Sequence, residues 1–280
     1  MRRLQKSCGR ILLGLFWALT ALFLPNAWSM HEGIPCYSCH VREAGKMGGG
    51  PSDDQRLPSS TICFSCHDAK QDTSGLNPPY VLNATMELAG GSFTPTLSDD
   101  ATGHNVLSTD TILGFTPPGG IPMREFGCLS CHDAHDNGNY RSLKKEINGY
   151  FTLVEVRGDP NYQENFYISG INQFCGACHE KFYGQGNLRE GEGWVRHPVG
   201  ITISGANHAD FDKWSRNKNR VTLVENPTGN ANDVRSAQVF CLSCHRAHAS
   251  PFGAAMRWDY RQTTTGCLEC HSSVYRTANP

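Results

Sequence analysis

The hydrophobic residues of this chain form one long run and many short clusters. Residues 11–24 are predominantly apolar, whereas residues 45–60, 72–80 and 92–122 are rich in Gly, Pro, Ser, Thr and Asp. That composition is typical of irregular chain. Loops of this length are uncommon in a compact domain with an aliphatic core, and only 39% of all residues are hydrophobic. The pattern therefore predicts a loop-rich protein that does not rely on a large aliphatic core.

Short regular elements are expected between these loops. The tetrapeptide Thr-Leu-Val-Glu occurs at 152–155 and again at 222–225. Each copy has the pattern of a short strand that opens a hairpin. Short helices are predicted wherever two cysteines precede a histidine. The expected fold class has little regular secondary structure, with short α-helices at these motifs, a few short β-hairpins and long loops.

The N-terminal segment has the pattern of an export signal. Four basic residues precede the apolar run, Pro25 interrupts it, and residues 27–29 resemble a small-x-small cleavage site. We expect residues 1–29 to be removed, together with Cys8, and residues 30–280 to form the mature domain in the periplasm or at the cell surface. The alternative is an uncleaved membrane anchor, although a span needs about 20 apolar residues.

The remaining twelve cysteines form six Cys-x-x-Cys pairs, and histidine follows every pair directly. This is the attachment signature of a c-type haem, in which two thiols bond to the porphyrin and the histidine binds the iron. Zinc ribbons and disulfides also use paired cysteines, but neither explains the six histidines. The sequence predicts six covalent haem c groups at Cys36/Cys39/His40, Cys63/Cys66/His67, Cys128/Cys131/His132, Cys175/Cys178/His179, Cys241/Cys244/His245 and Cys267/Cys270/His271.

Six further histidines provide one spare imidazole for each predicted iron. We expect most of the haems to be bis-histidine and low-spin, although Met47, Met86 and Met123 are alternative axial ligands. The spare imidazole that follows a Cys-x-x-Cys-His run by three residues must serve a neighbouring haem, because it cannot reach the opposite face of its own. The predicted distal ligands are His31, His104, His135, His197, His208 and His248.

The motif spacing predicts an internal duplication, at about 63–135 and 175–248. The second and third motifs begin 65 residues apart, and the fourth and fifth begin 66 residues apart. One isolated histidine lies inside each interval, His104 or His197. From this repeat we expect His104 to serve the haem on His67, and His197 to serve the haem on His179.

The charge of the mature chain is acidic. Loss of residues 1–29 leaves 21 Lys and Arg against 26 Asp and Glu, a net charge of −5. Haem propionates, which ionise like ordinary carboxyl groups, would make the holoprotein more acidic. This balance argues against a nucleic-acid partner. The large macrocycles can pack against the long loops and replace the missing core.

The sequence resembles the multihaem c-type cytochromes with paired Cys-x-x-Cys-His motifs. The likeness rests on Cys-Leu-Ser-Cys-His-x-Ala-His at 128–135 and 241–248, together with His-Pro-Val-Gly at 197–200. The resemblance implies electron transport in anaerobic or extracellular respiration. It also implies redox partners such as other cytochromes, a quinol dehydrogenase or a terminal reductase.

Electron transfer, rather than catalysis, is the function that these patterns favour. An iron with two histidine ligands has no open position for a substrate. The alternatives are a multihaem reductase of a small nitrogen or sulfur oxyanion and a subunit of a haem filament. A reductase often carries an unusual proximal ligand, and all six motifs here end in histidine. Some filament subunits of the resembling family share an axial histidine with the next subunit, and His31 lies near the predicted mature N-terminus.

The haem count can be measured directly. We predict that the intact mass of the exported protein exceeds that of the mature apo chain by six haem groups, because all six motifs are complete. Expression without the haem-attachment machinery should give an unfolded, protease-sensitive chain. A gain of four haem masses or fewer would contradict the count.

Overall fold

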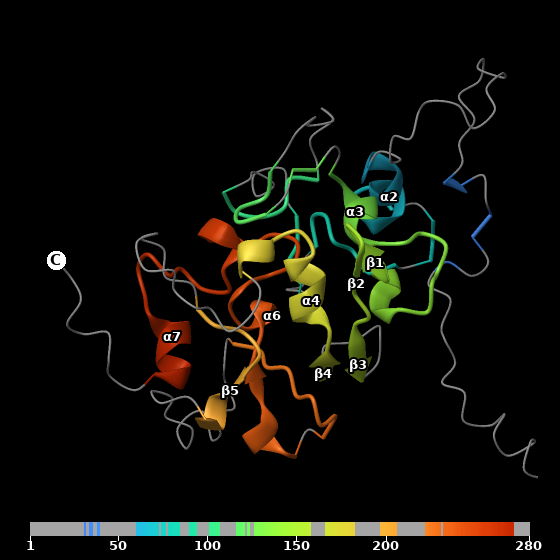
Figure 1. Cartoon of the computed structure of the whole chain (residues 1–280). Coiled ribbons are helices and arrows are strands. Elements are labelled where there is room, and N and C mark those ends of the chain that lie inside the picture. Colours follow the sequence, from blue (N-terminus) through green and yellow to red (C-terminus); the bar gives the residue numbers. More distant parts are fainter. Residues whose placement is uncertain are drawn as a thin grey trace, which may run out of the picture.

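The computed structural model describes residues 60–72, 74–76, 78–84, 90–93, 101–106, 116–120, 122–123, 126–157, 166–182, 197–205, 222–230 and 232–271, with residues 31, 34–35 and 38–39. All regular elements within these ranges are short (Figure 1). The helices are α2 (Ser60–His67), α3 (Cys128–Cys131), α4 (Ile171–Gly176), α6 (Cys241–Cys244) and α7 (Thr265–Cys270). The strands are β1 (Glu146–Ile147), β2 (Tyr150–Phe151), β3 (Glu155–Arg157), β4 (Phe166–Ser169), β5 (Ile201–Thr202) and β6 (Gln238–Val239).

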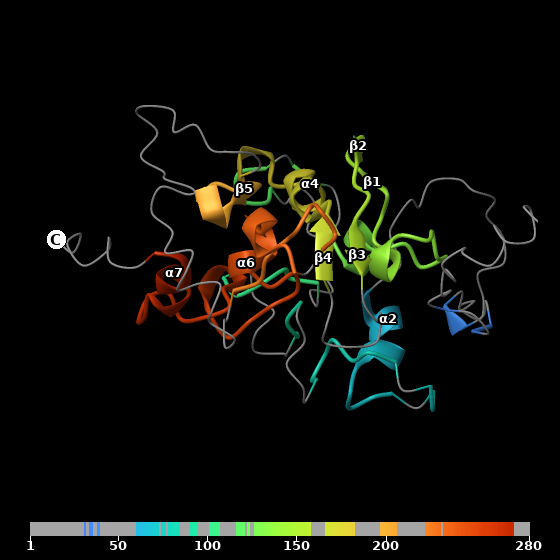
Figure 2. The same cartoon turned by 90° about the horizontal axis from the view of Figure 1, so that it is seen from below.

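The five helices cross the molecule in the order of the sequence. In Figure 1, α2 and α3 lie at one side, α4 and α6 near the middle, and α7 at the other side, and Figure 2 shows the same order for α2, α4, α6 and α7. Each of these helices carries or leads into one cysteine motif, so the motifs follow one another through the fold. This confirms the predicted fold class of short helices at the motifs, small strand pairs and long loops.

The strands form three antiparallel pairs. Ile147 pairs with Tyr150 in the β1–β2 hairpin, Val156 with Tyr167 between β3 and β4, and Ile201 with Val239 between β5 and β6. The hairpin turn is formed by Asn148 and Gly149, both with positive φ, as expected for an Asn-Gly turn. The hairpin projects from the body of the fold in Figure 2.

The two Thr-Leu-Val-Glu segments are only partly the strands that the sequence predicts. Strand β3 begins only at Glu155. The residues before it are held by side-chain hydrogen bonds and not by strand pairing. The buried Thr152 hydroxyl donates to the Lys144 carbonyl at 2.7 Å, and the Val154 N–H donates to the Asn139 side chain at 3.0 Å. In the second copy, Glu225 forms only isolated bridges, to Tyr167 and Gln238. Hydrogen bonds that involve side chains therefore replace ladder pairing in the first copy, and isolated bridges replace it in the second.

Among the residues that the structure describes, the apolar core is divided into three small clusters. The first lies around Phe64 and Phe93 beside α2, and the third contains only Ile203 and Ala237 as fully buried members. The central cluster is built on β4, α4 and α6, and its buried residues are Val154, Tyr167, Ile171, Phe240 and Leu242. Each cluster packs against at least one motif cysteine. The hydrophobic core thus forms around the motifs instead of forming a separate layer.

The predicted signal segment, residues 1–29, lies outside the described residues. Within the ranges that the structure describes, no helix is long and apolar enough to cross a membrane.

Asn172 offers a test of how the motif helices are joined. It is buried on α4, and its side-chain oxygen accepts the N–H of Cys241 at 2.9 Å, which caps α6. We predict that Asn172→Ala lowers the free energy of unfolding of the holoprotein by about 1–2 kcal/mol, because a buried helix N–H loses its acceptor.

Gln173 provides the matched control on the same helix. Its side chain is exposed, so Gln173→Ala should change stability by no more than about 0.5 kcal/mol. Chemical denaturation of both variants makes the comparison. Equal stability of the two would contradict a capping role for Asn172.

Candidate haem-binding sites

The Leu-Ser pair inside two of the motifs shapes the local helix. In α3, the Ser130 hydroxyl accepts the N–H of Gly127 at 3.0 Å, and in α6 the Ser243 hydroxyl accepts the N–H of Phe240 at 3.0 Å. Each serine thereby caps a single helical turn, where the first N–H groups lack partners within the helix. This turn holds two cysteines and the following histidine in one compact loop.

The cysteines of successive motifs lie beside one another at two junctions. The thiols of Cys63 and Cys128 share a hydrogen bond, which raises the pKa of Cys63 and lowers the pKa of Cys128 to about 7. Cys175 and Cys241 form the equivalent pair, with the pKa of Cys175 raised and that of Cys241 lowered. The second motif therefore adjoins the third, and the fourth adjoins the fifth.

Two further junctions involve electrostatic contact between cysteines. Burial raises the pKa of Cys131 to about 12, and the nearby Cys178 adds to this shift. Burial likewise raises the pKa of Cys244 to about 12, with contributions from Cys267 and Cys270. The third motif therefore adjoins the fourth, and the fifth adjoins the sixth.

The second motif meets the first through Cys63. The charge of Cys39 adds to the rise in the pKa of Cys63, after the hydrogen bond with Cys128, burial and the charge of Cys128. The half-buried Cys66 thiol accepts a weak local hydrogen bond from the Ser65 hydroxyl at 3.9 Å. Attachment of a haem at Cys66, as at the other motif cysteines, stays a prediction from the motifs.

The cysteines are available for covalent attachment. All eleven that the structure describes, Cys66 included, are free thiols. Two thioether bonds to each porphyrin require thiols in this form.

Histidines from distant parts of the chain face one another in four pairs. In each pair, one member follows a Cys-x-x-Cys motif and the other is a spare imidazole. Two metal–nitrogen bonds of about 2 Å on opposite sides of one ion place two imidazole centres roughly 6 Å apart. The observed centroid separations are 6.2 Å for His31–His67, 6.4 Å for His132–His248, 6.1 Å for His104–His179 and 6.1 Å for His197–His271.

Backbone carbonyls orient these rings. In the proximal position, Nδ1 of His67, His132 and His179 lies 2.8–3.0 Å from the carbonyls of residues 79, 141 and 118, respectively. An Nδ1–H that donates to a carbonyl leaves Nε2 as the free lone pair, which is the arrangement usual for metal-ligating histidines. The same contact is made by His31, His104, His197, His245 and His248.

The third and fifth motifs are held by the same set of backbone contacts. His132 bridges to Leu143 and His245 bridges to Met256, eleven residues later in each case. The intervening turn has positive φ at non-glycine residues, at Arg141 and Ser142 in one copy and at Ala254 and Ala255 in the other. This strained turn aims the carbonyl of Arg141, or of Ala254, at the Nδ1 of the proximal histidine.

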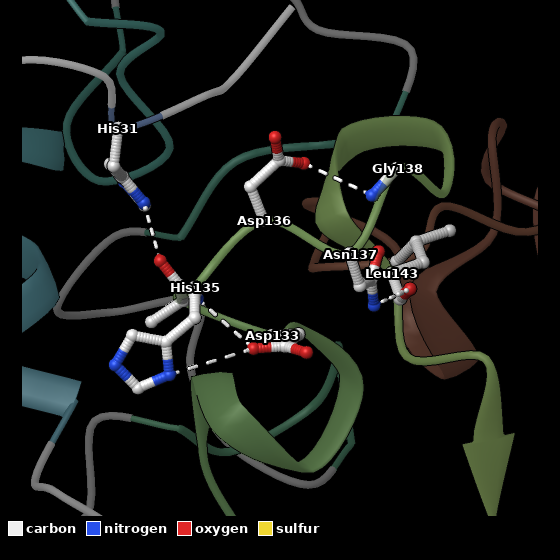
Figure 3. A network of polar contacts seen from close by, with 8 residues as sticks. His31, Asp133, His135, Asp136, Asn137, Gly138 and Leu143 are labelled. Atoms are coloured by element: carbon white, nitrogen blue, oxygen red, sulfur yellow. Dashed lines mark hydrogen bonds and ion pairs between the residues drawn. The ribbon is translucent and has the colours of Figure 1, made fainter. Parts of the chain in front are cut away.

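The alanine of each eight-residue motif also has a matching role. The Ala134 carbonyl accepts from Nδ1 of His31 at 3.0 Å, as Figure 3 shows, and the Ala247 carbonyl accepts from Nδ1 of His104 at 2.7 Å. A motif that carries one proximal histidine therefore also positions the spare histidine that faces the preceding motif. The sequence showed this alanine in both copies but gave no signal of its role.

Burial keeps several of these imidazoles neutral. The pKa of His248 falls to about 4, first because of burial and then because of the charge of His132. Burial also lowers the pKa of His104, His132 and His245. Only a neutral imidazole can donate its lone pair to iron, so the pocket favours the ligating form. The donor set and its spacing fit haem iron.

The expected partners of His104 and His197 are wrong. His104 faces His179 instead of His67. The backbone N–H of His104 donates to the His248 carbonyl at 2.9 Å, and this bond fixes His104 to the loop after the fifth motif. His197 faces His271 instead of His179, because β5 pairs with β6, and Ile203, which follows β5, packs in the cluster that includes Cys270. Long-range strand and loop contacts decide both pairs.

None of the four facing pairs includes His135. The His135 side chain is 82% exposed, and its Nδ1 lies 4.0 Å from Asp133 (Figure 3). Cys36, His40 and His208 lie outside the described residues, as do Met47 and Met86. In each of the four facing pairs both members are histidines, so no methionine occupies that position.

Comparison with known proteins bears on the class of protein. Residues 232–275, which hold the fifth and sixth motifs, match the family model described as doubled CXXCH motif. The structure is similar to the Outer Membrane Cytochrome S filament from Geobacter sulfurreducens, with 17% identity and a TM-score of 0.56 over 83% of this chain and 85% of that chain. These findings support a multihaem c-type cytochrome.

A second solved structure, of the OmcS nanowires from Geobacter sulfurreducens, has 19% identity and a TM-score of 0.49, and covers 72% of this chain and 75% of that chain. No curated protein matches the chain. At these identities the likeness concerns the fold.

The ring pairs predict which variants change the iron spin state. His248→Ala and His104→Ala should each convert one haem to the high-spin form, since one axial ligand is lost while the thioethers and the proximal histidine remain. The double variant should convert two haems, because the two histidines face different motifs. Electron paramagnetic resonance and visible absorption of the holoprotein measure the number. Fully low-spin spectra in both single variants would show that these histidines are not ligands.

Proposed function

We propose that this protein transfers electrons along a row of six covalently attached haems. The observation that carries the proposal is the order of the junctions between motifs. The charge of Cys39 affects the Cys63 thiol, which forms a hydrogen bond with Cys128. Cys131 is near Cys178, the Cys175 thiol forms a hydrogen bond with Cys241, and Cys244 is near Cys267. Each motif thus adjoins the next in the sequence, and haems on these sulfurs would form an unbranched series.

Axial ligation supports transport over catalysis. A haem held between two histidines has no vacant coordination position, so it can exchange electrons but cannot readily bind a small substrate. Four facing pairs have the spacing for this ligation. When bound, the haems supply one-electron redox chemistry, while the chain supplies the ligands, their orientation and the exclusion of water.

The matching contacts of the third and fifth motifs support an internal duplication and allow the remaining ligands to be inferred. The eight-residue motifs start 113 residues apart. In the later copy, His248 faces His132, which belongs to the third motif. The spare histidine of the later copy thus faces a proximal histidine two motifs earlier. The same step of two motifs would place His135, in the earlier copy, at the haem of the first motif, on His40. That assignment leaves His208 for the haem on His245, and all twelve histidines are then used.

The two kinds of junction alternate along the row. First cysteines meet at the junctions of motifs two and three and of motifs four and five, through Cys63–Cys128 and Cys175–Cys241. Second cysteines take part at the junctions of motifs three and four and of motifs five and six. A series with alternating contacts of this kind supports continuous conduction from one end of the chain to the other.

We further infer that the protein is exported and exchanges electrons with other redox proteins outside the inner membrane. Haem c attachment takes place after export, and the acidic mature chain would favour partners with complementary basic surfaces. Assembly into a filament is a second candidate, favoured by the likeness of fold to a filament subunit over 83% of this chain. Light scattering or electron microscopy of the purified holoprotein tests this assembly.

Film voltammetry distinguishes the carrier from a reductase. We predict reversible, non-catalytic waves that account for all six haems. Addition of nitrite, hydroxylamine or sulfite should leave these waves unchanged, because the irons offer no open position. A sustained catalytic current with any of these substrates would favour the reductase instead.

His135→Ala tests the assignment of the first haem. The variant should retain all six haems and show one high-spin iron. His31→Ala should also give one high-spin iron, and the double variant should give two. A spectrum of His135→Ala identical to that of the wild type would contradict this assignment.

A further inference from the structure

Glu225 is a buried carboxyl group between the fourth and fifth motifs. It is only 5% exposed, and its backbone pairs in both directions with Gln238, at 2.7 and 3.1 Å. Tyr167 of β4 lies beside it in a bridge. The backbone of this residue is therefore fixed on two sides, and its side chain is buried.

The carboxylate has too few partners for an ion in this position. Within the described segments, the N–H of Ile171 bonds to it, whereas Oε2 has no hydrogen-bond partner and no cationic side chain forms an ion pair with it. Burying an unpaired charge is costly, and such a group tends to become neutral. Burial accordingly raises the pKa of Glu225 to about 7, against the opposing effect of the Ile171 hydrogen bond.

The elements packed around Glu225 contribute few groups that could titrate in its place. β4 presents Tyr167, whose pKa is raised by burial, α4 begins with Ile171 and Asn172, and α6 begins with Cys241. Gln238 of β6 is neutral. The charges of Arg141 and Arg257 oppose this rise in the pKa of Tyr167. In the holoprotein Cys241 is a thioether, so Glu225 is the group of this cluster that can change protonation near neutral pH.

The haem attachment sulfurs are within electrostatic reach. The hydrogen bond with Cys175 lowers the pKa of the Cys241 thiol, whereas burial and the charge of Glu225 oppose this lowering; Cys241 also hydrogen-bonds to the Asn172 side chain. The carboxyl group is thus coupled to the position where the fifth haem is attached, and the fourth haem is attached one contact further away.

We propose that Glu225 is a proton-binding site coupled to reduction of the haem on Cys241, an inference that rests on the proposed haem row. An electron from a neighbouring ferrous haem converts the ferric iron to ferrous, and a proton from water binds Oε2 of Glu225. Oxidation reverses both changes. Reduction removes one positive charge from the iron centre, and protonation removes one negative charge from the carboxylate. The net charge of the buried site is therefore the same in both states.

The sign of the effect follows from electrostatics. A ferric centre carries one more positive charge than a ferrous centre, so it stabilises the carboxylate more strongly. The pKa of Glu225 is therefore higher when the haem is reduced. The midpoint potential of this haem falls as pH rises between the two pKa values and is constant on either side of them.

The chain contains its own control for this position. Glu155 ends the other Thr-Leu-Val-Glu copy, but it lies exposed on β3, where Ser169 donates a hydrogen bond to its carboxylate at 3.2 Å. The same tetrapeptide thus presents one carboxyl group to solvent and buries the other.

Spectroelectrochemical titration of the holoprotein at a series of pH values tests the proposal. Glu225→Gln keeps the shape of the side chain but cannot take up the proton, so we expect it to lose the pH-dependent shift of one haem near neutral pH. Glu155→Gln should keep the wild-type pH dependence, including any contribution from the propionates. Identical pH profiles for Glu225→Gln and the wild type would overturn the proposal.

A second measurement on the wild type covers the case in which Glu225→Gln fails to assemble. The reduced-minus-oxidised infrared spectrum at neutral pH should show the carbonyl stretch of a protonated carboxyl group, shifted in D2O. Reversible haem reduction without this band would overturn the role of Glu225 and leave electron transfer intact. Failure of the haems to undergo reversible reduction would instead contradict the proposed function itself.

Discussion

The hydrogen bond between a histidine Nδ1 and a backbone carbonyl is the contact on which the arrangement of these loops depends. Eight of the described histidines make it, and the carbonyls come from turns, from neighbouring motifs and from segments more than 100 residues away. Each bond fixes which nitrogen remains available for a metal. The positive φ values at Arg141 and Ala254 show that the backbone accepts local strain to place such a carbonyl. The irregular loops are thus positioned by the hydrogen bonds that orient the histidine rings.

The small hydrophobic clusters have a consequence for electrostatics. Because the apolar residues gather around the cysteine motifs, groups near the sulfurs are buried even though the fold has no large core. Burial lowers the pKa of His248 to about 4 and raises the pKa of Glu225 to about 7. The same low polarity that keeps an imidazole neutral for ligation makes a nearby carboxyl group sensitive to a change of charge.

The eight-residue motif contacts three other parts of the motif series. Its cysteines adjoin the preceding motif, its alanine carbonyl orients the imidazole that faces that preceding motif, and in the later copy its final histidine faces the motif of the earlier copy. Repeating such a unit extends a series without branching. This explains how long loops can still place the motifs in chain order.

The sequence alone determined the attachment chemistry, because Cys-x-x-Cys-His is a local pattern whose geometry is set within one helical turn. Composition and the scarcity of extended apolar patterns also predicted the fold class correctly. The partners of the spare histidines were decided only by the tertiary structure. His104 is fixed by the loop after His245, and His197 by the pairing of β5 with β6, and contacts at such sequence separations leave no periodic signal. For the same reason, two identical Thr-Leu-Val-Glu segments gave no indication that Glu155 would be exposed and Glu225 buried.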